Sequence, residues 1–164
     1  MNAGHHPTPD ANGTPSALPD TATVAMVDAI SAEGDALELV LTRARGVLML
    51  QTAGQFDHLE RAVRDLDSAS SALAMSSRSR EAAVEKVLGP IADRHQLVER
   101  CPENVSAVVA EAVARQHVTL LEVGEVSRAI TEGANAATRS LQQRRRELDR
   151  QASGSVTYDA PYRS

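Results

Sequence analysis

The placement of proline constrains the fold of this chain more strongly than any other sequence feature. Of its seven prolines, four fall within the first twenty residues, two stand at positions 90 and 102, and one lies among the last four residues. Two spans, residues 20–89 and 103–160, therefore contain no proline. Because proline costs about 3 kcal/mol in a helix interior, its absence permits a long helix in each span.

Apolar residues in the first span recur in steps of three and four, the pattern of amphipathic helices. Thr52-Ala53-Gly54 interrupts this pattern and Gly89-Pro90 ends it. Glycine suits a helix end or a tight turn, so the span predicts two helices that fold back as an antiparallel hairpin. The inward positions expected for the first helix are Val27, Ile30, Gly34, Leu37, Leu41, Ala44, Leu48 and Gln51. Those expected for the second helix are Phe56, Leu59, Val63, Leu66, Ser70, Leu73, Ser77, Arg80, Val84 and Val87.

The second span carries the longest stripe of this kind, after a short helix that we expect within residues 91–101. A helix over 103–150 would be about 72 Å long at about 1.5 Å per residue. This length exceeds the diameter of a small domain, so we expect part of the helix to project or to pair with another chain. The repeat is that of a coiled-coil seam. Its positions are Val105, Val109, Ala112, Gln116, Leu120, Val123, Ser127, Ile130, Ala134, Ala137, Leu141, Arg144 and Leu148.

These patterns predict an all-α fold, in which a long antiparallel helical hairpin and a long C-terminal helix form a coiled-coil-like bundle. We expect a disordered N-terminal arm over residues 1–22, a helical domain over 23–150 and a flexible C-terminal tail over 151–164. Only three residues of the chain are aromatic. That number disfavours both the core of a β-sandwich and an enzyme pocket.

Charge and cysteine content exclude several classes of protein. The formal net charge is −5, and the one basic cluster, at 144–146, is followed at once by acidic residues, so we expect no nucleic-acid partner. No stretch of 18 or more residues is apolar, so we expect no membrane span. The first residues lack the pattern of a secretory signal, and the single Cys101 excludes an internal disulfide. We therefore expect a cytoplasmic protein.

No motif in the sequence indicates catalysis, a metal or a cofactor. The histidines and the cysteine lack the spacing of a metal site, and no glycine-rich phosphate loop occurs. The carboxylates are expected on solvated helix faces, where pairs with arginines stabilise the helices. A histidine phosphotransfer bundle is a remote alternative, with His58 or His117 as the exposed imidazole, but an ordinary surface histidine explains each residue better. We therefore expect a protein that is not an enzyme.

The long helices are expected to be loosely held. Four glycines lie inside them, and each costs about 1 kcal/mol relative to alanine. Three seam positions of the last helix hold polar side chains, Gln116, Ser127 and Arg144, whose burial carries a cost. Such a seam indicates a surface that exchanges partners rather than a rigid rod, although plain irregularity of the helix gives the same pattern.

The C-terminal tail concentrates the aromatic residues of the chain. Tyr158 and Tyr162 both lie within the last seven residues. Tyrosine offers a large apolar area and a hydrogen-bonding tip, which suits a short docking motif. An inert terminus is the alternative interpretation.

The turn, the start of the last helix and the tail follow one another in a distinctive order. The turn Ala53-Gly54 precedes Leu59 by five residues, the last helix begins near Pro102-Glu103, and the tail reads Ser155-Val156-Thr157-Tyr158-Asp159-Ala160. Over about residues 24–160 this layout resembles the FlgN-type flagellar export chaperones. The chain has sixteen arginines and a single lysine, Lys86. In this preference for arginine it resembles the alanine- and arginine-rich members of the family from high-GC bacteria.

This resemblance implies a cytoplasmic chaperone for hook-associated proteins, which form the hook–filament junction. Such a chaperone masks the terminal helices of its cargo and delivers the cargo to the flagellar type III export gate. The last helix would pair with a cargo helix, and Tyr158 would contact the cytoplasmic domain of the gate protein. The residues expected to bind the partner are Val109, Leu120, Val123, Ile130, Ala137, Leu141 and Leu148.

A structural or adaptor coiled coil is the main alternative to the chaperone. The same seam would then pair with a second copy of the chain, and the protein would homo-oligomerise. Weak self-association is also compatible with the chaperone itself.

Overall fold

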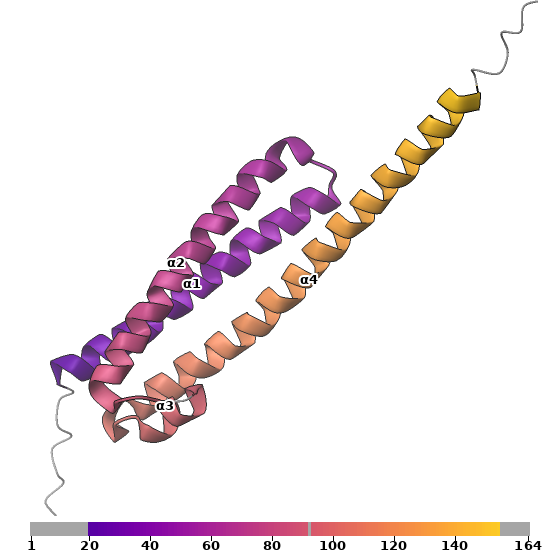
Figure 1. Cartoon of the computed structure of the whole chain (residues 1–164). Coiled ribbons are helices and arrows are strands. Elements are labelled where there is room, and N and C mark those ends of the chain that lie inside the picture. Colours follow the sequence, from indigo (N-terminus) through magenta and orange to yellow (C-terminus); the bar gives the residue numbers. More distant parts are fainter. Residues whose placement is uncertain (1–19, 92, 155–164) are drawn as a thin grey trace, which may run out of the picture.

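The computed structural model describes residues 20–91 and 93–154, and these form four α-helices and no strand. The all-α fold expected from the sequence is confirmed, with a long hairpin followed by a long last helix (Figure 1). The expected arm and tail lie outside the described residues, except that residues 21–22 and 151–154 are helical. The helices are α1 (Thr21–Thr52), α2 (Phe56–Leu88), α3 (Arg94–Arg100) and α4 (Glu103–Gly154).

The helix ends fall where the sequence places turn and cap residues. The carboxylate of Asp20 accepts a hydrogen bond of 2.7 Å from the backbone N–H of Thr23, which caps α1. Gly54, between α1 and α2, has φ 68°, and Gly89, at the end of α2, has φ 71°. Side chains other than glycine rarely adopt this backbone conformation, so the two expected breaks are confirmed.

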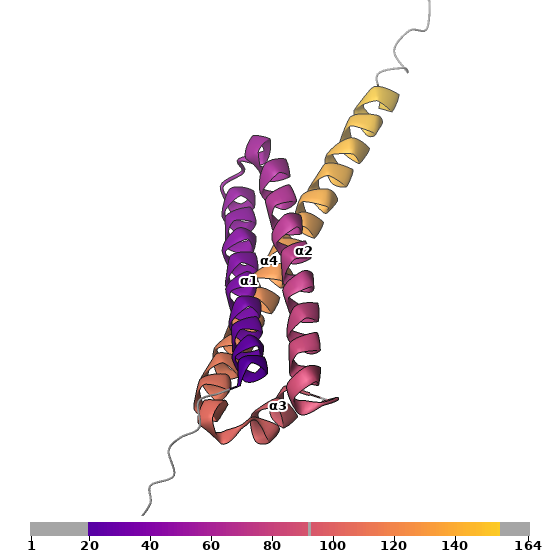
Figure 2. The same ribbon diagram turned by 90° about the vertical axis from the view of Figure 1, so that its left-hand side faces the viewer.

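α1 is the central helix of the bundle. α2 packs along one side of it and α4 along another, while the short α3 closes the end near the start of α1 (Figures 1 and 2). The main apolar core lies at this closed end, where all four helices contribute. Its buried side chains are Met26, Ile30, Val84, Leu97, Val105 and Val109.

The buried face of α1 differs in part from the expected one. Ile30, Leu37, Leu41 and Ala44 are buried as predicted, but the expected positions 27, 34 and 48 are less buried than their neighbours at 26, 33 and 47. The reason is that α1 packs against two helices, so its buried face is wider than a single stripe. The buried residues of α1 are Thr23, Met26, Ile30, Glu33, Leu37, Val40, Leu41, Ala44 and Val47.

α2 buries little, as its serine- and alanine-rich middle predicts. Within it only Ala69 and Val84 are buried. Phe56, the first residue of α2 and an expected inward position, leaves 62% of its surface exposed at the hairpin tip. In the described part of the chain, no helix is long and apolar enough to cross a membrane.

Candidate partner-binding surface on α4

The first half of α4 is part of the bundle. Val105, Val109, Gln116 and Thr119 are buried against the rest of the molecule. The buried position after Gln116 is therefore Thr119, whereas the expected seam residue Leu120 remains 41% exposed. The expected seam positions Val105, Val109 and Gln116 are therefore buried, and the seam differs from the expected stripe at Leu120, where Thr119 is the buried residue.

Gln116 shows how a polar side chain is accommodated in this packed half. Its side chain is buried, and its Nε2 donates a hydrogen bond of 2.7 Å to the backbone oxygen of Ile30 in α1. Gly34 lies beside it, and a Cβ at this position would be 3.5 Å from the same nitrogen. This hydrogen bond offsets the cost of burying the amide. The sequence pattern alone does not reveal that the amide has such a partner.

α4 separates from the bundle near Gly133. Gln51, close to the end of α1, donates a hydrogen bond of 3.2 Å from its Nε2 to the backbone oxygen of Ile130. A Cβ on Gly133 would lie only 2.7 Å from that nitrogen, so glycine allows the two helices to approach here. On the same pair of helices, Arg45 and Glu122 form an exposed ion pair of 2.7 Å.

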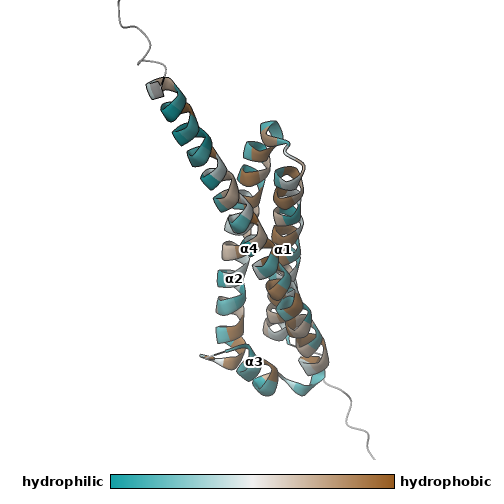
Figure 3. Ribbon diagram, turned by 90° about the vertical axis from the view of Figure 1, so that its right-hand side faces the viewer, coloured by the Kyte–Doolittle hydropathy of each residue, from teal (hydrophilic) through white to brown (hydrophobic). Residues whose placement is uncertain are grey.

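Beyond this point α4 continues without packing against the bundle. Every residue from 134 to 153 is exposed, and the helix extends past the hairpin tip (Figure 1). We call residues 134–153 the free segment of α4. Most of its residues are hydrophilic (Figure 3). The expected projection of the last helix is therefore confirmed.

The expected partner-binding residues divide into three groups along α4. Val109 is 1% exposed and belongs to the core, where α1 already covers it. Val123 and Ile130 are half-buried, and Leu120 is partly exposed beside them. Ala137, Leu141 and Leu148 lie on the free segment, and the two leucines expose 68% and 65% of their surface. Tyr158 lies outside the described residues.

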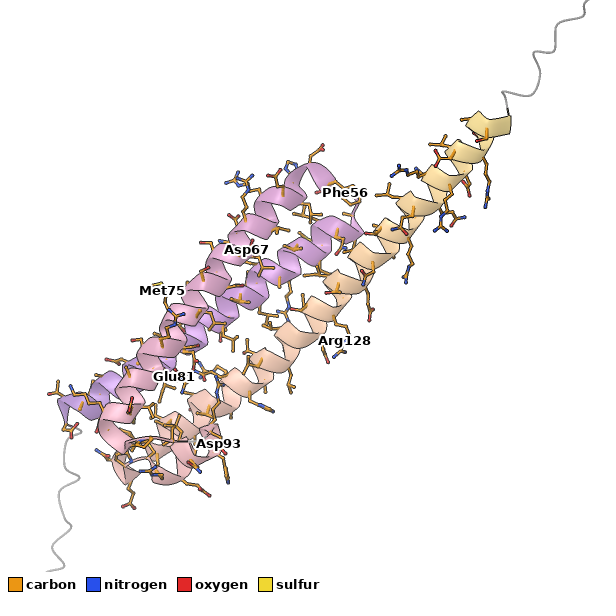
Figure 4. All side chains as sticks on the ribbon, in the orientation of Figure 1. Phe56, Asp67, Met75, Glu81, Asp93 and Arg128 are labelled. Carbon is orange, nitrogen blue, oxygen red and sulfur yellow. The ribbon has the colours of Figure 1, made fainter. Side chains whose placement is uncertain are left out.

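A groove lies at the base of the free segment, next to the hairpin tip. Its volume is about 310 Å³. Phe56 forms part of its wall from the start of α2, where α4 passes the hairpin (Figure 4). We call this cavity the tip groove. Its lining includes Leu48 and Gln51 of α1, Phe56 and Leu59 of α2, and Ala134 and Ala137 of α4.

A buried cluster of charged side chains, centred on Glu33, was missed by the sequence analysis. Glu33 Oε2 lies 2.9 Å from Arg80 Nε of α2 and 3.5 Å from Arg94 Nη2 of α3. Its Oε1 accepts a hydrogen bond of 2.7 Å from the hydroxyl of Ser77. The expectation that carboxylates lie on solvated faces is wrong for Glu33. The sequence did contain a signal of its burial: Glu33 lies three residues after Ile30 and four before Leu37, on the apolar face of the helix.

The chemically reactive side chains of the described residues form no metal-binding group. Residues 20–91 and 93–154 contain no group of three or more His, Cys, Asp and Glu side chains that could hold a metal ion. His58 and His117 are both exposed on helix surfaces. Partial burial raises the pKa of the Cys101 thiol, which disfavours the reactive thiolate.

The free segment of α4 and the tip groove are thus two neighbouring surfaces that a partner could contact together. Both are formed in part by Ala134 and Ala137, so they are continuous. Comparisons with protein-family models, with curated proteins and with solved structures give no match to this chain.

Proposed function

We propose that this protein is a cytoplasmic, non-enzymatic export chaperone of the FlgN type. It binds hook-associated proteins of the flagellar hook–filament junction through α4 and prevents their premature assembly. It then delivers them to the cytoplasmic domain of the type III export gate. The resemblance of the turn and of the tail supports the flagellar assignment, and the free segment of α4 supports the binding mode.

One observation carries the proposal: the free segment has an apolar stripe that the rest of the described chain leaves exposed. Ala134, Ala137 and Leu141 follow one another in steps of three and four, Leu148 lies seven residues after Leu141, and all four are exposed. An amphipathic helix or a coiled-coil partner buries such a stripe. The stripe is short and has only two large side chains, which favours a complex that can release its cargo at the gate.

Three predicted seam residues outside the free segment, Val109, Val123 and Ile130, are less exposed than the stripe. Val123 and Ile130 are half-buried and extend the stripe toward the tip groove. Val109 would reach a partner only if α4 separated from α1, because it lies in the core. The proposed surface is therefore the free segment together with its base.

The test is co-purification of the full chain with a co-expressed hook-associated protein. We expect a complex with the wild-type chain and its loss in the double variant Leu141→Glu/Leu148→Glu, which places two charges on the stripe. The matched control is Asn135→Glu/Gln142→Glu. It adds the same charges at the same spacing on another face of the exposed helix.

Two results would overturn the proposed binding mode. One is that the wild-type chain forms no complex with any hook-associated protein. The other is that the stripe variant retains its cargo as well as the control variant does. Sedimentation of the purified chain tests the alternative, because a stable oligomer that buries α4 at all concentrations would indicate a structural coiled coil instead.

The role proposed for the tail has a test of its own. A Tyr158→Ala variant is expected to capture cargo normally but to fail in binding the cytoplasmic domain of the export gate. Pull-down with that domain, with Tyr162→Ala as the control, measures the loss. Unchanged binding by Tyr158→Ala would remove this residue from the mechanism.

A further inference from the structure

The free segment of α4 has a charge opposite to that of the whole chain. The chain carries a formal net charge of −5. Residues 134–153 nevertheless contain five arginines and only two acidic residues. The acids are Glu147 and Asp149. A partner that binds along this segment therefore meets a basic surface.

Two of the five arginines lie directly beside the apolar stripe. At about 100° per residue, Arg144 and Arg145 fall on opposite sides of the line from Leu141 to Leu148. Both are exposed, and neither forms an ion pair with another residue of the described ranges. Arg139 and Arg146, by the same geometry, point away from the stripe. The charges that a bound helix would meet first are thus those of Arg144 and Arg145.

This arrangement disfavours a second copy of the chain as the partner. Arg144 occupies a seam position of the heptad pattern. In a parallel pair of free segments it would face its own copy, and like charges at a seam oppose pairing. A different helix with carboxylates beside its apolar residues would instead pair with both arginines.

The arginines require acidic residues on the partner, and the tip groove adds a second requirement, an apolar side chain that fits into it. It adjoins the stripe at Ala134 and Ala137, and apolar side chains such as Leu48, Leu59 and Phe56 contribute to its lining. Arg144 and Arg145 lie about ten residues further along α4, which corresponds to about 15 Å. A helix that covers the stripe would therefore reach the groove with one end and the two arginines with its middle.

We infer that the partner of α4 is an amphipathic helix with acidic residues beside its apolar stripe and a large apolar side chain at the end that enters the tip groove. This inference rests on the proposed function and specifies the cargo segment chemically. Continuity of the groove with the stripe and charge complementarity with Arg144 and Arg145 carry it.

The test uses two synthetic helical peptides of about 20 residues, long enough to span the free segment. Both have the same leucine stripe, and its flanking positions are glutamate in one peptide and lysine in the other. Binding to the full chain is followed by fluorescence anisotropy at low salt. We expect the glutamate peptide to bind about tenfold more tightly, with a preference that falls as salt is added.

Charge reversal on α4 provides the matched comparison. Arg144→Glu/Arg145→Glu is expected to abolish or reverse the preference for the glutamate peptide. Arg139→Glu/Arg146→Glu changes the net charge equally on the opposite face, and is expected to retain most of the preference. All four side chains are exposed, so both variants are expected to fold.

The groove is tested with a Phe56→Ala variant. It is expected to weaken binding of the glutamate peptide that has leucine at the groove end, but not of one that has alanine there. Met75→Ala is the control, because Met75 is similarly exposed on α2 and does not line the groove (Figure 4).

Several outcomes would overturn the inference. They are equal binding of the glutamate and lysine peptides, equal effects of the two charge reversals, and equal binding of an acidic peptide without leucines. The last outcome would indicate a general polyanion surface. If hook-associated cargo is captured but these preferences are absent, only the partner chemistry fails. If the preferences hold but no hook-associated protein binds, only the flagellar assignment fails.

Discussion

Glu33 joins three helices although it is a charged residue in the packed part of the bundle. Only 2% of it is exposed, and its carboxylate contacts Ser77 and Arg80 of α2 and Arg94 of α3. Burial of an unpaired carboxylate would cost several kcal/mol, so these contacts are needed to offset it. The cluster therefore links α1 to both α2 and α3 through one buried carboxylate.

Removing the charge of Glu33 is expected to destabilise the protein. Glu33→Gln leaves two guanidinium groups without their shared counter-charge, and we expect the free energy of unfolding to fall by about 2 kcal/mol. The matched control is Glu81→Gln, because Glu81 lies 3.5 Å from the same Arg80 but is exposed. Its loss is expected to be under about 0.5 kcal/mol. Urea unfolding measures both, and equal losses would contradict the role given to Glu33.

The cap of α1 gives the protein one acid-sensitive contact. The hydrogen bond from the backbone N–H of Thr23 lowers the pKa of Asp20 from its ordinary value of 3.8. Because the folded pKa is the lower one, the cap stabilises α1 above pH 3.8 and is lost as the pH falls through the folded value. An NMR titration of the Asp20 carboxyl should show a midpoint below 3.8, and a midpoint at or above this value would contradict the cap.

Among the elements, α1 and α4 contain glycines that no contact requires. A Cβ on Gly46 or Gly124 would meet nothing within 4 Å. These positions differ from Gly133, where a Cβ would crowd Gln51. Alanine could therefore replace Gly46 or Gly124 without a steric clash.

Gly124→Ala is expected to raise the free energy of unfolding by about 1 kcal/mol, because alanine has the higher helix propensity. Gly89→Ala is the contrasting variant. It is expected to lower stability by about 1 kcal/mol, since Gly89 has φ 71°. Thermal or urea unfolding separates the two, and a loss of stability in Gly124→Ala would show that this part of α4 needs glycine.

The sequence predicts where the helices begin and end better than it predicts which of their faces are buried. Prolines and glycines mark the ends of α1, α2 and α4, so the hairpin, the short α3 and the projection of α4 could be predicted. The buried faces could not, because α1 packs against two helices and because hydrogen bonds permit burial of Glu33 and Gln116. The tip groove was also beyond prediction, since residues from three helices form it.

At the scale of the whole molecule, the protein has two parts: a packed helical bundle and the free segment of α4. The core lies at the end closed by α3, whereas every residue of the free segment is exposed and the helix extends past the hairpin tip (Figures 1 and 2). Most helical stability in proteins comes from packing, so the free segment is expected to open readily when no partner is bound. Binding of a cargo helix would supply the missing packing.

Hydrogen exchange of the backbone amides, measured with and without a bound hook-associated protein, tests the central claim most directly. We expect fast exchange over residues 134–153 in the free chain and strong protection of this segment in the complex. The exchange rates of amides in the buried part of α1 should change little, because the helical bundle is already packed without a partner. Unchanged exchange over 134–153 in a confirmed complex would contradict the claim that the free segment is the partner-binding surface.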